Sequence, residues 1–207
     1  VMGWYEDTLF PPLLDWATRP LNRDRDALLA GARGRVLELG VGTGANFGRY
    51  TPAATEIHGI EPGGAMLAKA RAAAEALPQP ERFHLVEAGA EALPYPDHHF
   101  DTVIACLVFC TIPDREAAAR EVARVLRPDG QLLVLEHVQS ERPLTRRVQH
   151  GLNPLWRHLA CGCQLTRDTG TLLADHGFDI SDLRRWRHPK LPGFAGELLQ
   201  GVATRKI

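Results

Sequence analysis

The chain has 207 residues, a net charge of −1 and 44% hydrophobic residues, which is a globular composition and excludes a disordered chain. The balanced charge argues against a protein that grips nucleic acid with its whole surface, since phosphate binding shows as a basic excess. The longest apolar stretch, residues 103–110, is far shorter than a membrane span, and the first residues lack the pattern of a secretory signal. Four cysteines are too few for a disulfide scaffold. We therefore expect a cytoplasmic protein without a membrane span.

The first thirty residues predict two helices. One apolar face recurs at three- and four-residue spacing, formed by Leu9, Phe10, Leu13, Leu14 and Ala17. Prolines 11 and 12 place the start of this helix close to them, because proline is tolerated only near a helix start. A second helix is predicted over residues 24–32, ended by Gly34. Tyr5 and its aromatic neighbours either form a lid over a ligand or simply pack an amphipathic helix.

From residue 35 the chain alternates between strand and helix patterns. Short apolar runs bounded by turn residues predict buried strands at 35–39, 56–61, 83–87, 102–109 and 131–136. Helical patterns lie between them at 65–76 and 113–126. This alternation predicts an α/β fold with a doubly wound, mostly parallel sheet.

The last third is less regular. It predicts helices at 144–159 and 168–176 and late strands at 178–183 and 201–204. Lys and Arg exceed Asp and Glu between residues 142 and 190. This excess indicates either solvated faces or attraction to an anionic substrate or a membrane surface.

A glycine-rich turn directly follows the first predicted strand. Gly40, Gly42 and Gly44 stand at alternate positions, where they allow a sharp turn and a close approach of backbone N–H groups to a ligand. Glu61 ends the second predicted strand, at the carboxyl edge of the sheet, where a carboxylate can accept both ribose hydroxyls. The third glycine comes one residue earlier than in the dinucleotide fingerprint, so we expect a nucleoside with an uncharged or zwitterionic arm.

These motifs resemble those of a known enzyme family. The segment from Glu38 to Gly44 is similar to motif I of class I S-adenosylmethionine-dependent methyltransferases, and Glu61 matches their acidic ribose ligand. Residues 126–130 match the family's turn before strand five, and residues 91–97 with 100–101 match the branch that methylates small molecules. The resemblance covers residues 33–137 and implies a Rossmann-like class I methyltransferase fold with an N-terminal helical lid, and S-adenosyl-L-methionine as cofactor.

The resemblance also implies the residues that bind the cofactor. They are Glu38, Gly40, Gly42, Gly44, Asn46, Glu61, Pro62, Gly89, Ala90, Glu91, Cys106, Leu107 and Tyr5. Gly89 stands where many members of the family have an Asp that binds the adenine amino group. Adenine is then read by the backbone of Gly89 and Ala90, or by Glu91.

A narrower resemblance lies outside the shared core. Cys110 follows the fourth predicted strand, His137 ends the fifth, and Trp156 precedes a Gly-Cys-Gln-Leu-Thr-Arg segment at 162–167. This order is similar to the microsomal thiol S-methyltransferases (the methyltransferase-like seven family) and implies S-methylation of a small thiol by a soluble relative of these membrane-anchored enzymes. Phospholipid N-methylation and quinone C-methylation remain alternatives with the same cofactor. A non-catalytic nucleoside-binding module is an alternative of another class.

Two side chains are candidates for catalysis. His137 either takes or orients the acceptor proton, or is a hydrogen-bonded structural histidine. Arg167 either attracts a thiolate or lies on the surface. A base or a nearby positive charge helps such an acceptor only modestly, because a few per cent of a thiol is already thiolate at neutral pH.

The four cysteines do not have zinc-site spacing. Cys106 and Cys110 are four residues apart, and Cys161 and Cys163 are two apart. We therefore expect no metal and treat them as small buried side chains, with a three-thiolate arsenite site as the alternative.

The expected organisation is one methyltransferase domain over residues 1–207. It comprises a helical segment (1–33), a cofactor-binding core (34–137) and an acceptor-side segment (138–207). The expected partner is a small-molecule methyl acceptor, with peripheral membrane contact as a further expectation and no nucleic acid.

Overall fold

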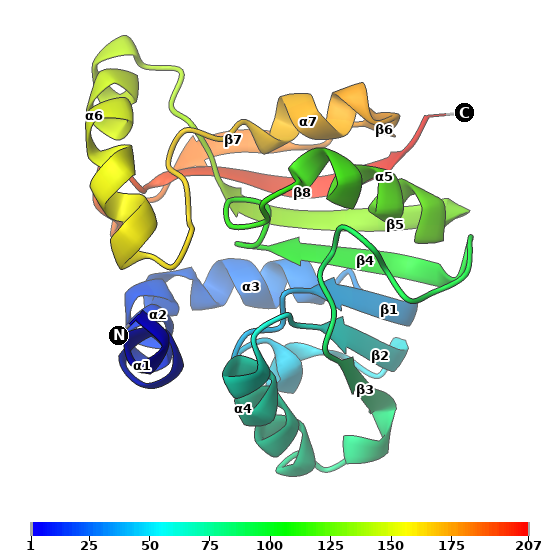
Figure 1. Cartoon of the computed structure of the whole chain (residues 1–207). Coiled ribbons are helices and arrows are strands. Elements are labelled where there is room, and N and C mark those ends of the chain that lie inside the picture. Colours follow the sequence, from blue (N-terminus) through cyan, green and yellow to red (C-terminus); the bar gives the residue numbers. More distant parts are fainter. Residues whose placement is uncertain (1, 207) are drawn as a thin grey trace.

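The fold is built on one eight-stranded sheet. The computed structural model describes residues 2–206, and the side chains of all of these except Met2 and Asp7. The strand order is β3-β2-β1-β4-β5-β8-β6, with β7 also paired to β8 (Figure 1). The parallel strands are β1 (Gly34–Leu39), β2 (Ala54–Ile60), β3 (Phe83–Val86), β4 (Phe100–Cys106) and β5 (Leu126–His137). The antiparallel pairings involve β6 (Phe178–Asp179), β7 (Arg184–Arg187) and β8 (Glu197–Arg205).

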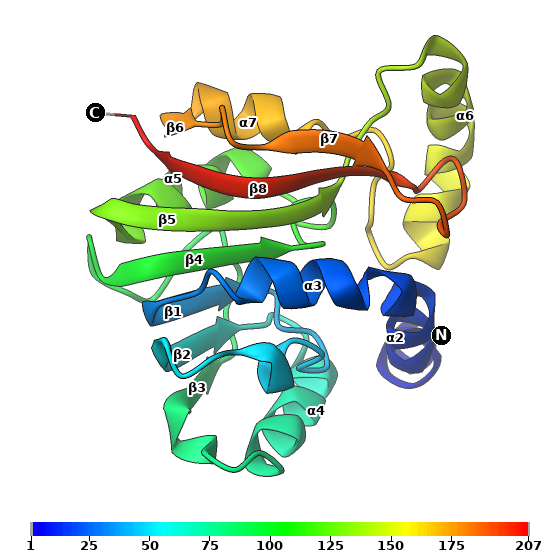
Figure 2. The ribbon, with the colours of Figure 1, turned by 180° about the vertical axis from the view of Figure 1, so that it is seen from behind.

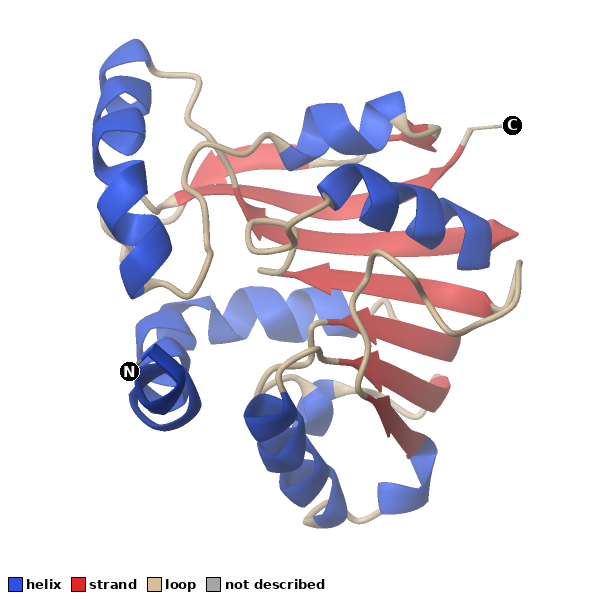
Figure 3. Cartoon of the chain, in the orientation of Figure 1, coloured by secondary structure: helices blue, strands red, loops and turns tan. Residues whose placement is uncertain are grey.

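Helices cover both faces of this sheet. The principal helices are α1 (Met2–Trp4), α2 (Phe10–Thr18), α3 (Asn22–Leu29), α4 (Gly64–Glu75), α5 (Arg115–Val125), α6 (Pro143–Leu159) and α7 (Thr169–Asp175). A π-helical turn, Tyr5–Leu9, joins α1 to α2, and 3₁₀ turns occupy Arg19–Leu21, Phe47–Arg49 and Pro80–Arg82. Helices α4, α5 and α7 lie on one face, and α3 lies on the other (Figures 2 and 3). Helix α6 and the α1–α2 segment stand together at one end of the sheet.

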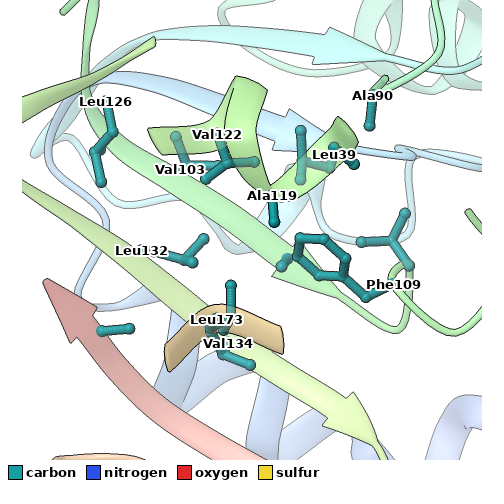
Figure 4. Close-up of a cluster of buried hydrophobic side chains, with 14 of the residues drawn as sticks. Leu39, Ala90, Val103, Phe109, Ala119, Val122, Leu126, Leu132, Val134 and Leu173 are labelled. Carbon is teal, nitrogen blue, oxygen red and sulfur yellow. The ribbon is translucent and has the colours of Figure 1, made fainter. Parts of the chain in front are cut away.

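Two hydrophobic cores follow from this layering. On β1, Leu37 packs into the core beneath α5, and its neighbour Val36 packs into the core beneath α3, because successive strand residues point to opposite faces. The larger core includes Phe109, Val122 and Leu132 and is shown in Figure 4. Both faces of the parallel strands are covered, which explains why these strands are continuous apolar runs in the sequence.

The register brings several strand ends to one edge. Leu39 at the end of β1 lies beside Ile60 of β2 and Ala105 of β4. The strand order reverses direction between β1 and β4, and open α/β sheets bind ligands at such a point, outside the carboxyl ends of the strands. The glycine turn therefore lies where this fold places a ligand.

The predicted α/β fold with a mostly parallel sheet is confirmed, and several element boundaries differ. The predicted helix start near prolines 11 and 12 is confirmed, because α2 begins at Phe10 and has its prolines in the first turn. The helical residues before it, α1 and the π-helical turn, were not predicted. Gly34, with φ of +64°, begins β1 and does not end a helix. Strand β4 ends at Cys106, where Leu107 turns to a φ of +58°. The late strand predicted at 178–183 is only two residues long, and β7 was not predicted.

Within residues 2–206, no helix combines the length and the apolar character that crossing a membrane requires.

Candidate active site

The glycine turn after β1 is left-handed at all three glycines. The φ angles are +59° at Gly40, +56° at Gly42 and +82° at Gly44. A Cβ at Gly40 would lie 2.6 Å from a methyl group of Val108, and one at Gly44 would lie 2.8 Å from the Phe47 ring. A Cβ at Gly42 would meet no atom within 4 Å. Gly40 and Gly44 are thus required by packing, whereas Gly42 borders open space.

The Glu61 carboxylate fastens this turn to the end of β2. Its Oε2 accepts a hydrogen bond from the Gly42 N–H and its Oε1 accepts one from the Gly63 N–H, both at 3.0 Å. Burial raises the pKa of Glu61, and the two backbone hydrogen bonds partly oppose the rise. The carboxylate retains lone pairs for further donors, as a ribose ligand requires. Pro62, between Glu61 and Gly63, is exposed.

Beneath the turn, Glu38 is buried in a hydrogen-bond network. Its Oε1 accepts from Asn46 Nδ2 at 2.7 Å and its Oε2 accepts from the Tyr50 hydroxyl at 2.6 Å. Burial raises the pKa of Glu38 to about 7, although both hydrogen bonds lower it. Both Glu38 oxygens are therefore occupied from within the protein. Asn46 Oδ1 is buried without a partner among the described residues.

A hollow opens beside the turn. Six of the predicted cofactor residues line it, namely Glu38, Gly40, Gly42, Asn46, Cys106 and Leu107. The N-terminal helices contribute Leu14, Asp15 and Arg25, which sequence reasoning did not select. The hydroxyl of Thr43 donates to the Asp15 carboxylate at 3.0 Å and so ties α2 to the glycine turn.

Comparisons with known proteins agree with this geometry. Residues 37–134 match a family model described as a methyltransferase domain. The chain is 37% identical over 166 residues to the human thiol S-methyltransferase TMT1A, covering 77% of this chain and 67% of the relative. It is 34% identical over 131 residues to the phosphatidylethanolamine N-methyltransferase of Cereibacter sphaeroides, covering 63% of this chain and 64% of the relative. The crystal structure of YcgJ from Bacillus subtilis matches with a TM-score of 0.66 at 25% identity, covering 81% of this chain and 71% of that one.

The chain belongs to the class I S-adenosylmethionine-dependent methyltransferases. It spans about two thirds of the human relative. The predicted fold, enzyme class and cofactor are thereby confirmed. Two features of the described residues fit a bound cofactor here: Gly42 borders open space, and Asn46 Oδ1 is a buried acceptor without a partner among them.

The N-terminal segment reaches the site through α2, and contact of Tyr5 with the cofactor stays a prediction. The Tyr5 hydroxyl donates to the Leu159 carbonyl at 2.7 Å and joins the N-terminal segment to the end of α6. Tyr5 does not line the hollow beside the glycine turn, whereas Leu14 and Asp15 of α2 do. The part of the N-terminal segment that lines this hollow is therefore α2. It follows the aromatic residues that suggested a lid.

The residues expected to hold adenine lie in the loop after β3. Ala90 is buried and packs in the core beneath α5. A Cβ at Gly89 would lie 2.6 Å from Glu91 Oε2, so the Glu91 side chain folds back over the Gly89 backbone. None of the three lines the hollow, and their contact with adenine stays a prediction.

On the acceptor side, His137 and Cys163 are in contact. His137 is 8% exposed at the carboxyl end of β5, and its Nε2 lies 2.9 Å from Cys163 Sγ. Trp156 Nε1 donates to the same sulfur at 3.3 Å. Cys110, in the loop after β4, brings a second sulfur to this group. Sequence spacing missed this arrangement, because the residues come from segments far apart in the chain.

The contacts among Cys110, His137, Trp156 and Cys163 shift the pKa values of Cys163 and His137. The pKa of the Cys163 thiol lies well below its ordinary value, because Cys110 donates a hydrogen bond to it and His137 and Trp156 add to that effect. Burial opposes the charged form of His137, but the neighbouring Cys163 sulfur outweighs burial and raises the His137 pKa. The pair therefore favours a thiolate beside an imidazolium.

Arg167 is buried and not on the surface. Its Nη1 donates to the carbonyls of Phe109 and Ile112 at 2.6 and 2.5 Å, which ties down the loop after β4. Burial lowers its pKa, and the sulfurs of Cys110 and Cys163 oppose that effect. Both predicted catalytic residues thus border one polar group at the carboxyl ends of β4 and β5.

Proposed function

We propose that this methyltransferase transfers the methyl group of S-adenosyl-L-methionine to the sulfur of a small thiol. One observation carries the proposal: the residues that gave the resemblance to thiol S-methyltransferases converge in space. Cys110, His137, Trp156 and Cys163 are linked by contacts, and Arg167 lies beside them. The 37% identity to human TMT1A supports the same acceptor class.

The cofactor site is proposed from the geometry of the turn. Glu61 accepts the ribose hydroxyls with the lone pairs that Gly42 and Gly63 leave free. Gly42 admits the nucleoside by having no side chain, and α2 excludes water through Leu14 and Asp15. Bound there, S-adenosyl-L-methionine supplies an activated methyl group on a sulfonium centre.

The residues of the acceptor side favour a thiolate. The acceptor sulfur binds beside His137, and the buried Arg167 guanidinium supplies positive charge there. Attack forms the S–CH₃ bond and breaks the donor's C–S bond, whose electron pair stays on the donor sulfur, while the thiol proton passes to solvent. Holding both partners at near-attack distance lowers the activation free energy by about 7–11 kcal/mol.

The test is incubation of the protein with labelled S-adenosyl-L-methionine and a panel of thiols, amines, phenols and lipid dispersions. We expect label in the thiol products at rates above those of every other class. Label confined to lipids would contradict thiol methylation, and cofactor binding without any transfer would identify a nucleoside-binding module.

A phospholipid amine or a quinone carbon is the second candidate acceptor, and an exposed apolar face favours it. Leucines and a valine repeat along the outer side of α6: Leu144, Val148, Leu152, Leu155 and Leu159, all at least 38% exposed. The buried residue of this helix is instead the polar Gln149. We call these five residues the α6 apolar face.

We propose that the α6 apolar face rests on an anionic membrane surface. Arg146, Arg147 and Arg157 lie on the same helix and are exposed, so apolar burial and attraction to anionic headgroups act together. The N-terminal segment beside α6 adds further exposed side chains: Trp4, Leu9, Leu13 and Trp16. Figures 1 and 2 both show this segment and α6 at the same end of the molecule. This surface gives a peripheral contact and requires no membrane span.

A further inference from the structure

Cys110, His137 and Cys163 form a cluster that cofactor binding does not use. Each offers one ligand atom, and these atoms all lie within 4.8 Å of one another. They come from the loop after β4, the end of β5 and the loop between α6 and α7. Two thiols and an imidazole are a soft donor set, which selects Zn²⁺ and related ions over Mg²⁺ or Ca²⁺.

The surrounding backbone holds the cluster in place. The Gln164 N–H donates to the Cys110 carbonyl at 2.9 Å and so joins two of the three segments. The Gln139 N–H donates to the Arg167 carbonyl at 2.8 Å and joins the third. The Trp156 indole donates to Cys163 Sγ, which is the kind of outer hydrogen bond that orients a metal-binding thiolate.

We propose that Cys110, His137 and Cys163 bind one Zn²⁺ ion and leave its fourth position open for the sulfur of the methyl acceptor. Tetrahedral zinc, with Zn–S near ~2.3 Å and Zn–N near ~2.0 Å, places its ligand atoms about 3.4–3.8 Å apart. The ligand atoms here lie within 4.8 Å, and the 2.9 Å between His137 Nε2 and Cys163 Sγ widens by less than about 1 Å to admit the ion.

Charge balance supports the assignment. Two thiolates neutralise a divalent cation, so the buried cluster becomes uncharged when it is filled. Three protein ligands with one open position are the arrangement of zinc sites that act on substrates, whereas structural zinc sites have four protein ligands.

The role of the open position rests on the proposed function. A thiol that coordinates the ion loses its proton to solvent and becomes a thiolate nucleophile. Its sulfur then bonds to the methyl carbon, the donor's C–S bond breaks, and the electron pair of that bond remains on the donor sulfur. The ion keeps its charge throughout, so the reaction needs no oxidant or reductant.

The metal site is tested on the full chain, reduced with a phosphine and stripped with a chelator. Titration with Co²⁺ should give one equivalent per chain, with a sulfur-to-cobalt charge-transfer band and intense tetrahedral d–d bands that Zn²⁺ abolishes. Absence of this spectrum in the wild type overturns the proposal without any variant.

Variants then assign the ligands. Cys110→Ser and Cys163→Ser should each weaken Zn²⁺ binding by more than about 100-fold. Cys161→Ser, two residues from Cys163 and outside the cluster, is the matched control and should bind Zn²⁺ like the wild type. Calorimetry with S-adenosyl-L-methionine reports that each variant is folded. Equal effects of Cys161→Ser and Cys163→Ser would overturn the ligand assignment.

The open position is tested on the cobalt protein without the methyl donor. Addition of 2-mercaptoethanol should shift the charge-transfer band, and ethylene glycol should leave it unchanged. A spectrum that does not respond to the thiol overturns the acceptor role of the fourth position. If cobalt binds as expected but thiols are not methylated, the proposed function fails and the metal site stands.

Discussion

At the scale of single residues, a substitution at Gly42 should lower cofactor affinity in addition to lowering the free energy of unfolding. We expect Gly42→Ala to weaken binding of S-adenosyl-L-methionine by more than about 10-fold, since its methyl group enters the space left for the ligand. The left-handed φ of +56° adds a strain of about 1–2 kcal/mol in stability.

Gly177→Ala is the matched control for that strain. Gly177 has a φ of +82°, nothing within 4 Å of its Cβ position, and no place in the lining of the hollow. Both variants should lose similar stability in urea denaturation, and only Gly42→Ala should lose affinity in calorimetry. Equal affinities would contradict the placement of the cofactor at Gly42.

The Glu61 carboxylate is proposed to accept the ribose hydroxyls of the cofactor. Glu61→Gln should weaken cofactor binding by about 1.5–3 kcal/mol, because the ribose hydrogen bonds lose their charged acceptor. Glu56→Gln removes a carboxylate from the same region of the chain, where it pairs with Arg35 and His58, and should bind normally. Calorimetry of both variants decides the point, and unchanged affinity in Glu61→Gln would refute the ribose contact.

The pH dependence of binding gives an independent check on Glu61. Burial raises its pKa in the free protein, so its proton is retained to a higher pH than in an ordinary Glu. If the ionised form accepts the ribose hydroxyls, cofactor affinity should fall as pH falls through that raised pKa, at a higher pH than an ordinary Glu would show. The affinity of Glu61→Gln should lack this component. Parallel pH profiles for the two proteins would show that Glu61 does not bind as a carboxylate.

At element scale, the α6 apolar face predicts membrane binding. The double variant Leu144→Glu, Leu155→Glu replaces side chains that are 74% and 61% exposed, so the fold should persist. Its co-sedimentation with vesicles of phosphatidylcholine and phosphatidylglycerol should fall by at least about 10-fold, because two apolar anchors become anions. Val86→Glu alters an exposed apolar residue on β3 and should bind like the wild type. Wild-type protein that stays in the supernatant would contradict the assignment of this face.

The elements also show what the sequence could and could not reveal. The parallel strands were predictable because burial on both faces makes them apolar runs, as in β1 and β4. Strand β7 was not, because Arg-Arg-Trp-Arg has neither an apolar run nor alternation and exists through pairing with β8. The start of α2 at Phe10 was predictable because proline limits where a helix can begin, whereas the helical residues before it were not predicted.

The candidate site shows the same difference between features that the sequence predicts locally and contacts that depend on tertiary packing. The glycine turn and Glu61 could be identified from the sequence, because each lies at the end of a single predicted strand. Asp15 and the convergence of Cys110 with Cys163 could not, because helix and loop packing brings them to the site from distant parts of the chain. Local chemistry was thus predictable, and contacts made by tertiary packing were not.

At the scale of the whole molecule, the buried Glu38 predicts how stability changes with pH. Its side chain is 1% exposed, and burial raises its pKa from 4.5 to about 7 in the folded state. Between these values the folded protein holds a proton that the unfolded chain has lost, so this group's contribution to stability falls as pH rises. The shift corresponds to about 3 kcal/mol over the whole window.

The comparison with Glu38→Gln isolates this contribution, because glutamine does not titrate. We expect the free energy of unfolding of the wild type, minus that of the variant, to decrease by about 3 kcal/mol from below pH ~4.5 to above pH ~7, measured by urea denaturation. Glu56→Gln should show the opposite sign at lower pH. Its hydrogen bond to Arg35 lowers the Glu56 pKa to about 2, so that contribution is present above the ordinary pKa and lost as pH falls. A wild-type advantage over Glu38→Gln that grows with pH would mean that Glu38 is stabilised as a carboxylate, and the buried network beneath the glycine turn would then need another charge to balance it.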